Sequence, residues 1–352
     1  MGQFGIGQPV RRTEDARFVT GRGRYTDDVN LPGQAAAYVL RSPHAHAKIL
    51  KVDASAAKAA PGVRLVLTGA DVKGKIQPVP CIIPMKNRDG SLRADPPHPV
   101  LADERVRHVG DPVAFVVAET LAEARDAAEL IEIDYETLPA IADTEAAAQP
   151  GAIKVYDAMA SNVCFDWEKG DRAGVEAAFK AAAHVVSAKV INNRIVVATM
   201  EPRMALAGLE PDVLLFFYVS SQNAFNIKAQ LCGMLGLKPK ELHAITPDVG
   251  GGFGMKLFMY AEYALALYAA KTLGRAVKWR AERGEAFLSD TQGRDNVTTG
   301  ELALDKDLRF LALRVRNIAN MCAYFSTFAP YIPTDAGTPL LASVYTFKAI
   351  HT

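Results

Sequence analysis

The sequence lacks the features that mark several large classes of protein. Its 352 residues carry a net charge of only +1, so no surplus of one sign indicates binding to nucleic acid or to an anionic membrane. No run of about 18 apolar residues occurs, which argues against a membrane-spanning helix. The opening MGQFGIGQPVRRTEDARF has no apolar core of the kind that a secretory signal contains.

Cysteine is also scarce, and its four positions lie far apart in the chain: Cys81, Cys164, Cys232 and Cys322. No C-x-x-C pair occurs, so the chain offers no zinc-ribbon or Fe–S motif of its own. A disulfide framework is not expected at this density, and a reducing compartment fits better. We therefore expect a cytoplasmic location.

The composition, with 49% hydrophobic and 22% charged residues, is that of an ordinary globular protein with room for more than one domain. The hydrophobic pattern predicts an α+β fold. Residues 1–20 are polar and irregular and predict an arm that wraps a neighbouring surface. Residues 21–140 predict a compact α+β domain, residues 141–162 a linker, and residues 163–352 a second region.

Several elements of this fold are predicted in detail. Helical spacing from Asn223 to Leu235 ends at Gly236, and helical spacing from Phe258 to Leu273 ends at Gly274. The apolar run VLLFFYV, residues 213–219, predicts a buried strand. Thr120 is a candidate N-cap for the helix TLAEARDAAELI, and residues 297–325 predict a long hairpin that turns at Asp305-Lys306-Asp307.

The most unusual segment is TPDVGGGFGMK, Thr246–Lys256. It is not a P-loop, because Met255 precedes the lysine and Leu257 follows it. It also lacks the last glycine of the dinucleotide fingerprint. Its predicted position between a strand and a helix would let free backbone N–H groups form an anion-binding nest. The alternative is a tight strand-to-helix crossing without a ligand.

A possible metal site rests on His44 and His46, which lie two apart on a predicted strand and so share one face. Without a third ligand nearby, a structural role is the favoured interpretation.

The glycine segment belongs to an ordered series of motifs. RRTEDARFVTGRGRYTDDVNLPG, RSPHAHAKI, GVRLVLTGADV, VRHVGDPVAFVVAE and EIDYETLPA are followed by NNRIVVATMEPRMALA, SSQNAFNIKAQLCGMLGL, TPDVGGGFGMK and VKWRAERGEAFL. Together they resemble the molybdopterin-binding large subunit of the molybdenum hydroxylases, the family of xanthine dehydrogenase, aldehyde oxidase and aerobic carbon monoxide dehydrogenase. The resemblance implies a hammerhead-type α/β domain followed by the first part of a molybdopterin-binding α+β domain.

The resemblance also implies a chemistry. In this family a molybdenum–pyranopterin cofactor, here expected in its cytosine dinucleotide form, hydroxylates a C–H bond of an aldehyde or N-heteroaromatic ring with oxygen from water. Electrons leave through an Fe–S small subunit and an FAD medium subunit. A neutral amide that matches Gln222 hydrogen-bonds an oxo ligand of the metal; the alternative for Gln222 is a structural residue in the first turn of the helix that follows. The loop that matches Gly251, Gly252, Phe253 and Gly254 lies against the cofactor, where Phe253 would exclude water.

Other matching residues are expected to be structural. Glu201, Pro202 and Arg203 form the family's MEPR-like segment, and we expect Glu201 and Arg203 to pair near the cofactor region. Three further charged residues predict an ion-pair and packing network: Arg280, Arg283 and Glu285.

The departures from the family pattern restrict the function. The xanthine-type branch holds purines with a glutamate where this chain has Leu257, which argues against a purine substrate. No residue of this sequence matches three features of the family: the catalytic glutamate, the AYRGAGRPE-like segment and the special cysteine of the carbon monoxide branch. We therefore expect a half-subunit that needs a complementary C-terminal chain. The alternatives are a non-catalytic assembly module and a truncated relic.

Overall fold

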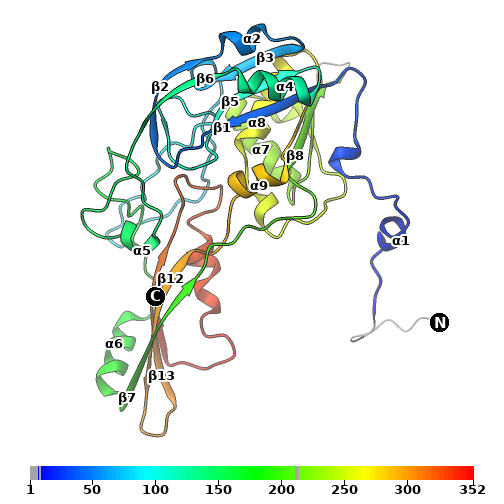
Figure 1. The fold of residues 1–352 in the computed structure, drawn as a ribbon. Coiled ribbons are helices and arrows are strands. Elements are labelled where there is room, and N and C mark those ends of the chain that lie inside the picture. The colour runs from blue at the N-terminus through cyan, green and yellow to red at the C-terminus, as the bar shows by residue number, and fades with distance from the viewer. Residues whose placement is uncertain (1–6, 8, 211–213) are drawn as a thin grey trace, which may run out of the picture.

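The computed structural model describes residues 7, 9–210 and 214–352 (Figure 1). The chain is of mixed α+β type, as the sequence predicts. Its largest element is a seven-stranded sheet with the strand order β10-β9-β8-β11-β1-β5-β3. The strands span Leu242–Ile245 (β10), Leu215–Val219 (β9), Met204–Leu209 (β8), Val277–Arg280 (β11), Ala35–Arg41 (β1), Pro112–Ala118 (β5) and Val63–Thr68 (β3).

This sheet joins the two regions of the chain. β1 from the first region pairs in parallel with β11 from the second, with Ala35 opposite Val277. β5 lies beside β1, and every residue of β5 is buried. The sheet therefore contains strands from both sides of the boundary predicted near residue 140, and one hydrophobic core packs against strands of both regions.

Two helices that cover this sheet confirm the predicted glycine stops. Helix α7 spans Ala224–Leu235 and helix α8 spans Ala261–Leu273, and each ends at a left-handed glycine, Gly236 or Gly274. The second helix begins three residues later than predicted, because Met255–Leu257 forms a 3-10 turn and Phe258 and Tyr260 are extended. The run at 213–219 contains the buried strand β9, while Val213 lies outside the described residues.

A three-stranded sheet, β4-β2-β6, belongs to the first region. Helix α4, Leu121–Glu129, packs on β1 and β5. Thr120 is its N-cap as predicted, with a reciprocal hydrogen-bond pair to Glu123. The remaining elements of this region are β2 (Ala47–Asp53), β4 (Arg105–Val106), β6 (Glu132–Thr137), α2 (Ser55–Ala59), α3 (Gly69–Val72) and the 3-10 turn Thr26–Asp28.

A four-stranded sheet, β14-β13-β12-β7, extends away from the main body (Figure 1). The predicted hairpin is confirmed as β12 and β13, which turn at residues 305–309. The bounds are β7 (His184–Asn192), β12 (Asn296–Leu304), β13 (Phe310–Ala319), β14 (Ala349–His351), α5 (Thr144–Ala147), α6 (Arg172–Ala181), α9 (Arg283–Ser289), a 3-10 turn at Pro239–Glu241, a π-turn at Ile332–Ala336 and a 3-10 turn at Thr338–Leu340.

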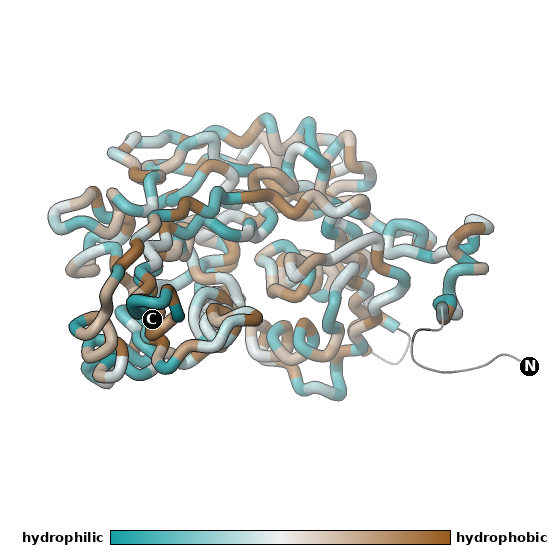
Figure 2. The backbone as a smooth tube through the Cα atoms, turned by 90° about the horizontal axis from the view of Figure 1, so that it is seen from below, coloured by the Kyte–Doolittle hydropathy of each residue, from teal (hydrophilic) through white to brown (hydrophobic). Residues whose placement is uncertain are grey.

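The predicted arm stands away from the body in both Figure 1 and Figure 2. Its helix α1, Asp15–Phe18, is tied to the glycine segment by Arg17, which forms a bidentate ion pair with Asp248. The backbone N–H of Arg24 also donates to Asp248, at 2.7 Å. Among the described residues, no helix combines the length and the apolarity that crossing a bilayer requires.

Candidate functional site

The glycine segment lies at one edge of the seven-stranded sheet, where β9 and β10 end. These two strands are parallel neighbours, so their carboxyl ends point in the same direction. The residues after β9 are Ser220, Ser221 and Gln222, and the residues after β10 form the glycine segment. Open sheets with parallel strands commonly bind ligands at this edge. The topology therefore brings Gln222 and the predicted cofactor loop together.

The backbone of the loop requires its glycines. Gly251 and Gly254 have φ angles of +94° and +89°, which L side chains rarely adopt. Between them Phe253 is held at φ +48°, a left-handed conformation that is costly for an aromatic residue. Strained residues of this kind concentrate at ligand sites, so the geometry favours a binding role over a simple chain crossing.

Three successive backbone N–H groups of the loop are available to a ligand. Those of Gly251, Gly252 and Phe253 have no acceptor among the residues that the structure describes. Their neighbours are occupied, because the N–H of Gly250 donates to Glu201 and that of Gly254 donates to Gln222. A run of free N–H groups is the donor set that oxygen or sulfur atoms of an anionic group require.

Gln222 packs directly against this loop. Its Oε1 accepts the hydrogen bond from Gly254 at 2.9 Å, and a Cβ on Gly252 would lie 2.6 Å from its side chain. Since Oε1 faces a donor, Nε2 is the amide's free end, and no described residue accepts a hydrogen bond from it. Gln222 precedes Asn223, the N-cap of α7, so it is not a residue of that helix's first turn.

Apolar side chains in the loop and in the two segments that contact it are largely exposed. Met200, Phe225 and Phe253 are 90%, 87% and 81% exposed. Met200 adjoins Thr199, and a Cβ added to Gly251 would lie 3.7 Å from the Cβ of Thr199. Phe225 lies in the first turn of α7, three residues after Gln222. Exposed apolar groups gathered at one site indicate a surface that contacts a ligand or another polypeptide segment. The shielding role of Phe253 stays a prediction.

A buried charge pair holds both ends of the loop. Lys256 has no exposed surface, and its Nζ lies 2.9 Å from Glu201 Oε2 and 2.7 Å from Ser220 Oγ. Glu201 Oε2 also accepts from the N–H of Gly250 at 2.7 Å. The carbonyl of Lys256 accepts from Gln222 N–H at 3.1 Å. Burial lowers the pKa of Lys256, against the opposing effect of Glu201.

The ion pair between Lys256 and Glu201 was not predicted from the sequence, which suggested Arg203 as the partner of Glu201. Glu201 and Arg203 do not pair with each other, because Lys256 is the counter-charge of Glu201, while Arg203 pairs with Glu262 and Asp290. The sequence prediction gave Lys256 no role. Its position between the apolar residues Met255 and Leu257 is the one sequence feature that could have indicated a buried ammonium group.

Arg203 instead centres a second buried network. Its Nη1 lies 3.0 Å from Glu262, and its Nε lies 2.5 Å from Asp290. Arg41 of β1 joins the network through Glu262 and Glu285. Burial raises the pKa of Glu262, but the charges of Arg203 and Arg41 lower it to about 2. These contacts fasten the first region to the second behind the loop.

The predicted set Arg280, Arg283 and Glu285 does not form one network. Glu285 belongs to the Arg41 cluster, and burial raises its pKa despite that partner. Arg280 pairs with Asp27 at 2.9 Å. The guanidinium of Arg283 donates to the carbonyls of Thr199 and Met200, beside the loop.

The two histidines give no support to a metal site. Both histidines lie in the bend before β2. The prediction that they share a strand is therefore wrong. His46 Nδ1 is 2.8 Å from the carbonyl of Pro139, and the ring of His44 packs edge-on against Tyr135. No group of three His, Cys, Asp or Glu residues able to hold a metal occurs in the described part of the chain.

Comparisons with known proteins place this geometry in a family. Residues 20–139 match the model of the aldehyde oxidase and xanthine dehydrogenase a/b hammerhead domain, and residues 155–352 match that of the molybdopterin cofactor-binding domain. The carbon monoxide dehydrogenase large chain of Afipia carboxidovorans is 37% identical over 91% of this chain. The nicotine 6-hydroxylase large subunit of Paenarthrobacter nicotinovorans is 35% identical over 91%.

Solved structures agree with these relatives. Quinoline 2-oxidoreductase from Pseudomonas putida 86 has a TM-score of 0.88 at 34% identity, over 98% of this chain and 44% of that one. The Cu,Mo-CO dehydrogenase has a TM-score of 0.84 at 33% identity, over 99% and 44%. The chain spans 40% and 38% of the two relatives' lengths. The chain therefore belongs to the family of molybdenum hydroxylase large subunits and corresponds to their hammerhead domain and the first part of their molybdopterin-binding domain.

Proposed function

We propose that this chain is the part of a molybdenum hydroxylase large subunit that holds one side of the molybdopterin cofactor. The observation that carries the proposal is the pairing of Gln222 with Gly254, which leaves the Gln222 Nε2 donor and the N–H groups of residues 251–253 free at one edge of the sheet. In this proposal, the hammerhead domain covers residues 21–140 and the cofactor-binding region starts at residue 163.

The residues present fit an anionic cofactor. The free N–H groups of residues 251–253 would bind oxygen or sulfur atoms of the cofactor, and Nε2 of Gln222 would orient an oxygen atom without adding charge. The bound cofactor supplies the oxidation of an aldehyde or N-heteroaromatic C–H bond, with water as the oxygen source. The cytosine dinucleotide form and a cytoplasmic location belong to the same proposal.

The chain would work as one part of a larger assembly. The family's general base matches none of its residues, so a complementary C-terminal polypeptide would supply that glutamate. An Fe–S subunit and an FAD subunit would take the electrons. Leu257, which occupies the position of the purine-binding glutamate, favours substrates other than purines.

The test is co-expression of this chain with the C-terminal polypeptide and the two partner subunits. We expect the purified complex to contain molybdenum and to release a cytosine nucleotide on acid treatment. Gln222→Ala should lower the rate of aldehyde or N-heteroaromatic oxidation about 100-fold, since one preorganised donor at the reacting group is lost. The control is Gln77→Ala, which removes an exposed glutamine elsewhere.

Either of two results would contradict the proposal. One is a stable complex that never carries molybdenum or the pterin. The other is a Gln222→Ala complex whose rate equals that of the Gln77→Ala control.

A further inference from the structure

The N-terminal segment 9–24 meets the rest of the protein at one residue of the glycine segment. In the part of the chain that the structure describes, every hydrogen bond and ion pair between residues 9–24 and later residues ends on Asp248. None of these sixteen positions is buried, and helix α1 has no buried side chain. Burial of apolar surface therefore does not explain why this segment meets Asp248.

Asp248 is held through its side chain and through its backbone. Its carboxylate accepts the bidentate ion pair from Arg17 and the N–H of Arg24, the latter at 2.7 Å. Its own N–H donates to the carbonyl of Arg24 at 3.0 Å, and it forms an isolated parallel bridge with Tyr25. A bidentate arginine–carboxylate pair fixes direction as well as distance. These contacts, which we call the arm clip, therefore fix the chain two residues before Gly250.

The arm clip also controls the charge beside the free N–H groups of residues 251–253. Three residues of fully extended chain span at most about 11 Å, so the Cα atoms of Asp248 and Gly251 are no further apart than that. At this range an uncompensated carboxylate would oppose the binding of an anion to the loop. Arg17 supplies the compensating charge. Its hydrogen bond also holds the pKa of the Asp248 carboxyl below its usual range, so the pair stays ionised at neutral pH.

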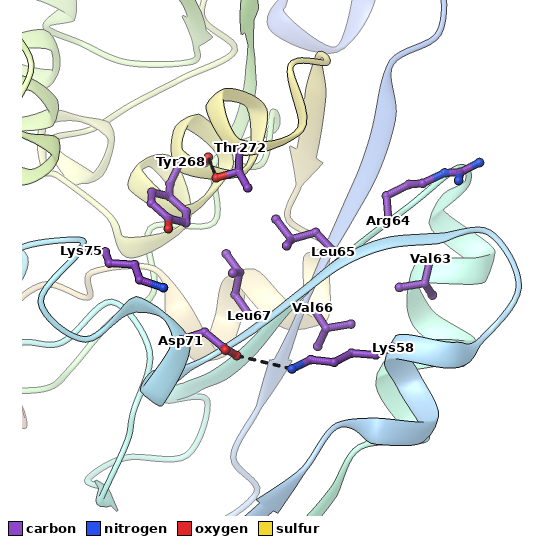
Figure 3. A pocket seen from close by; sticks show the side chains of 10 residues that line it. All are labelled: Lys58, Val63, Arg64, Leu65, Val66, Leu67, Asp71, Lys75, Tyr268 and Thr272. Atoms are coloured by element: carbon purple, nitrogen blue, oxygen red, sulfur yellow. Dashed lines mark hydrogen bonds and ion pairs between the residues drawn. The ribbon is translucent and has the colours of Figure 1, made fainter.

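A second cluster of cations lies too far away to take this role. It borders a hollow of about 420 Å³ beside β3 and consists of Lys58, Arg64 and Lys75 (Figure 3). Two of the three already face carboxylates, because Lys58 lies 4.0 Å from Asp71 and Arg64 pairs with Glu119. β3 is at the opposite edge of the seven-stranded sheet from β10, which leads into the glycine segment. The positive charge at Asp248 therefore comes from the arm and not from this hollow.

We infer that Arg17 is a positioning residue for the cofactor loop: it neutralises Asp248 and fixes the chain that enters the run of free N–H groups at residues 251–253. The inference rests on the proposed function, which it deepens. In this role Arg17 acts through Asp248 and not on the reacting atoms. The arm clip also explains why two motifs of the sequence, RRTEDARF and TPDVGGGFGMK, meet although Arg17 and Asp248 are 231 residues apart.

The first test is hydrogen exchange in the chain without cofactor. Arg17→Gln should accelerate exchange at the Asp248 and Gly250 amides about fivefold, because the chain that carries them opens more often once the ion pair is lost. The urea midpoint of the whole chain should not change, since the segment contributes nothing to the core. Arg12→Gln is the matched control, because Arg12 pairs with Asp15 inside the arm at 2.9 Å and should leave both amides unaffected.

The second test measures how fast the co-expressed complex loses molybdenum on dialysis. At low salt, Arg17→Gln should lose it about fivefold faster than Arg12→Gln, because Asp248 then repels the anionic cofactor. The difference should vanish at about 1 M salt, where the Debye length is about 3 Å. Adding Asp248→Asn to Arg17→Gln should restore retention, because the unpaired charge is removed even though the ion pair is not rebuilt.

Three results would overturn the inference. They are equal exchange or equal molybdenum loss for Arg17→Gln and Arg12→Gln, a double variant that loses molybdenum as fast as Arg17→Gln, and a lower urea midpoint for Arg17→Gln, which would show a role in global stability instead. A complex that never carries molybdenum would contradict the proposed function, and the exchange experiment would then decide by itself whether Arg17 fixes the loop.

Discussion

Replacing Lys256 by methionine tests how the cofactor loop is held in place. The substitution keeps the length and much of the apolar volume of the side chain but removes its charge. Glu201, only 9% exposed, then loses its counter-charge and keeps the hydrogen bonds from Ser220 and Gly250. The perturbation therefore acts on a buried carboxylate directly beneath the loop.

The structure sets the expected magnitude. Removal of one partner of a buried ion pair costs about 3–5 kcal/mol of unfolding free energy, since the other charge stays desolvated and unpaired. Lys48 provides the matched control, because it pairs with Glu136 at the same distance of 2.9 Å while both side chains are over 40% exposed. Lys48→Met should cost only about 0–1 kcal/mol.

The assay is urea unfolding of a double-mutant cycle. Glu201→Gln, Lys256→Met and the double variant are compared with the unchanged chain at pH 7. The double variant should be more stable than the sum of the single losses predicts, with a coupling of about 0.5–3 kcal/mol. Hydrogen exchange at the Gly250 amide, which donates to Glu201, should accelerate in each single variant.

Additive losses would contradict this prediction, because they would mean that the two charges do not interact in the folded protein. A Lys256→Met variant no less stable than Lys48→Met would also contradict it. In that case the ammonium would be hydrated, and the loop would be held by its backbone contacts alone.

Two further predictions concern the glycine loop and His98, which is half-buried. Gly250→Ala should destabilise the protein more than Gly252→Ala in urea unfolding, because the new Cβ lies 2.5 Å from Glu201 Cβ in the first variant and 2.6 Å from the flexible Gln222 side chain in the second. Gly252→Ala should chiefly lower the molybdenum content. Equal urea midpoints for the two variants would contradict this prediction. Burial, helped by His108, lowers the pKa of His98 from 6.5 to about 4. Between these values the unfolded chain binds more protons, so the unfolding free energy should fall as pH drops from 6.5 to 4. His98→Gln should flatten that part of a thermal-unfolding profile, and an unchanged slope would argue against a buried neutral ring.

Local signals in the sequence determined much of the loop's surroundings. Gly236 and Gly274 end α7 and α8 because a left-handed residue without Cβ closes a helix at low cost, and this depends on few neighbours. The glycine cluster indicated a nest of free backbone N–H groups or a tight strand-to-helix crossing, and the structure shows that Gly251 and Gly254 have positive φ angles. The resemblance to the molybdenum hydroxylases, carried by motifs in order, singled out Gln222 as a candidate site residue, and the structure shows that it contacts this loop.

Long-range pairing was decided only by the tertiary structure. The spacing along the chain does not show that β1 pairs with β11, that Glu201 meets Lys256, or that Arg203 meets Glu262. These partners are 50 or more residues apart, and a charged side chain alone does not reveal whether it will be buried or which opposite charge will accompany it. Burial makes the pairing obligatory, since an unpaired charge in the core costs several kcal/mol, about the stability of a whole domain. The sequence by itself determined where the backbone bends, and the packed core decided which charges hold that bend in place.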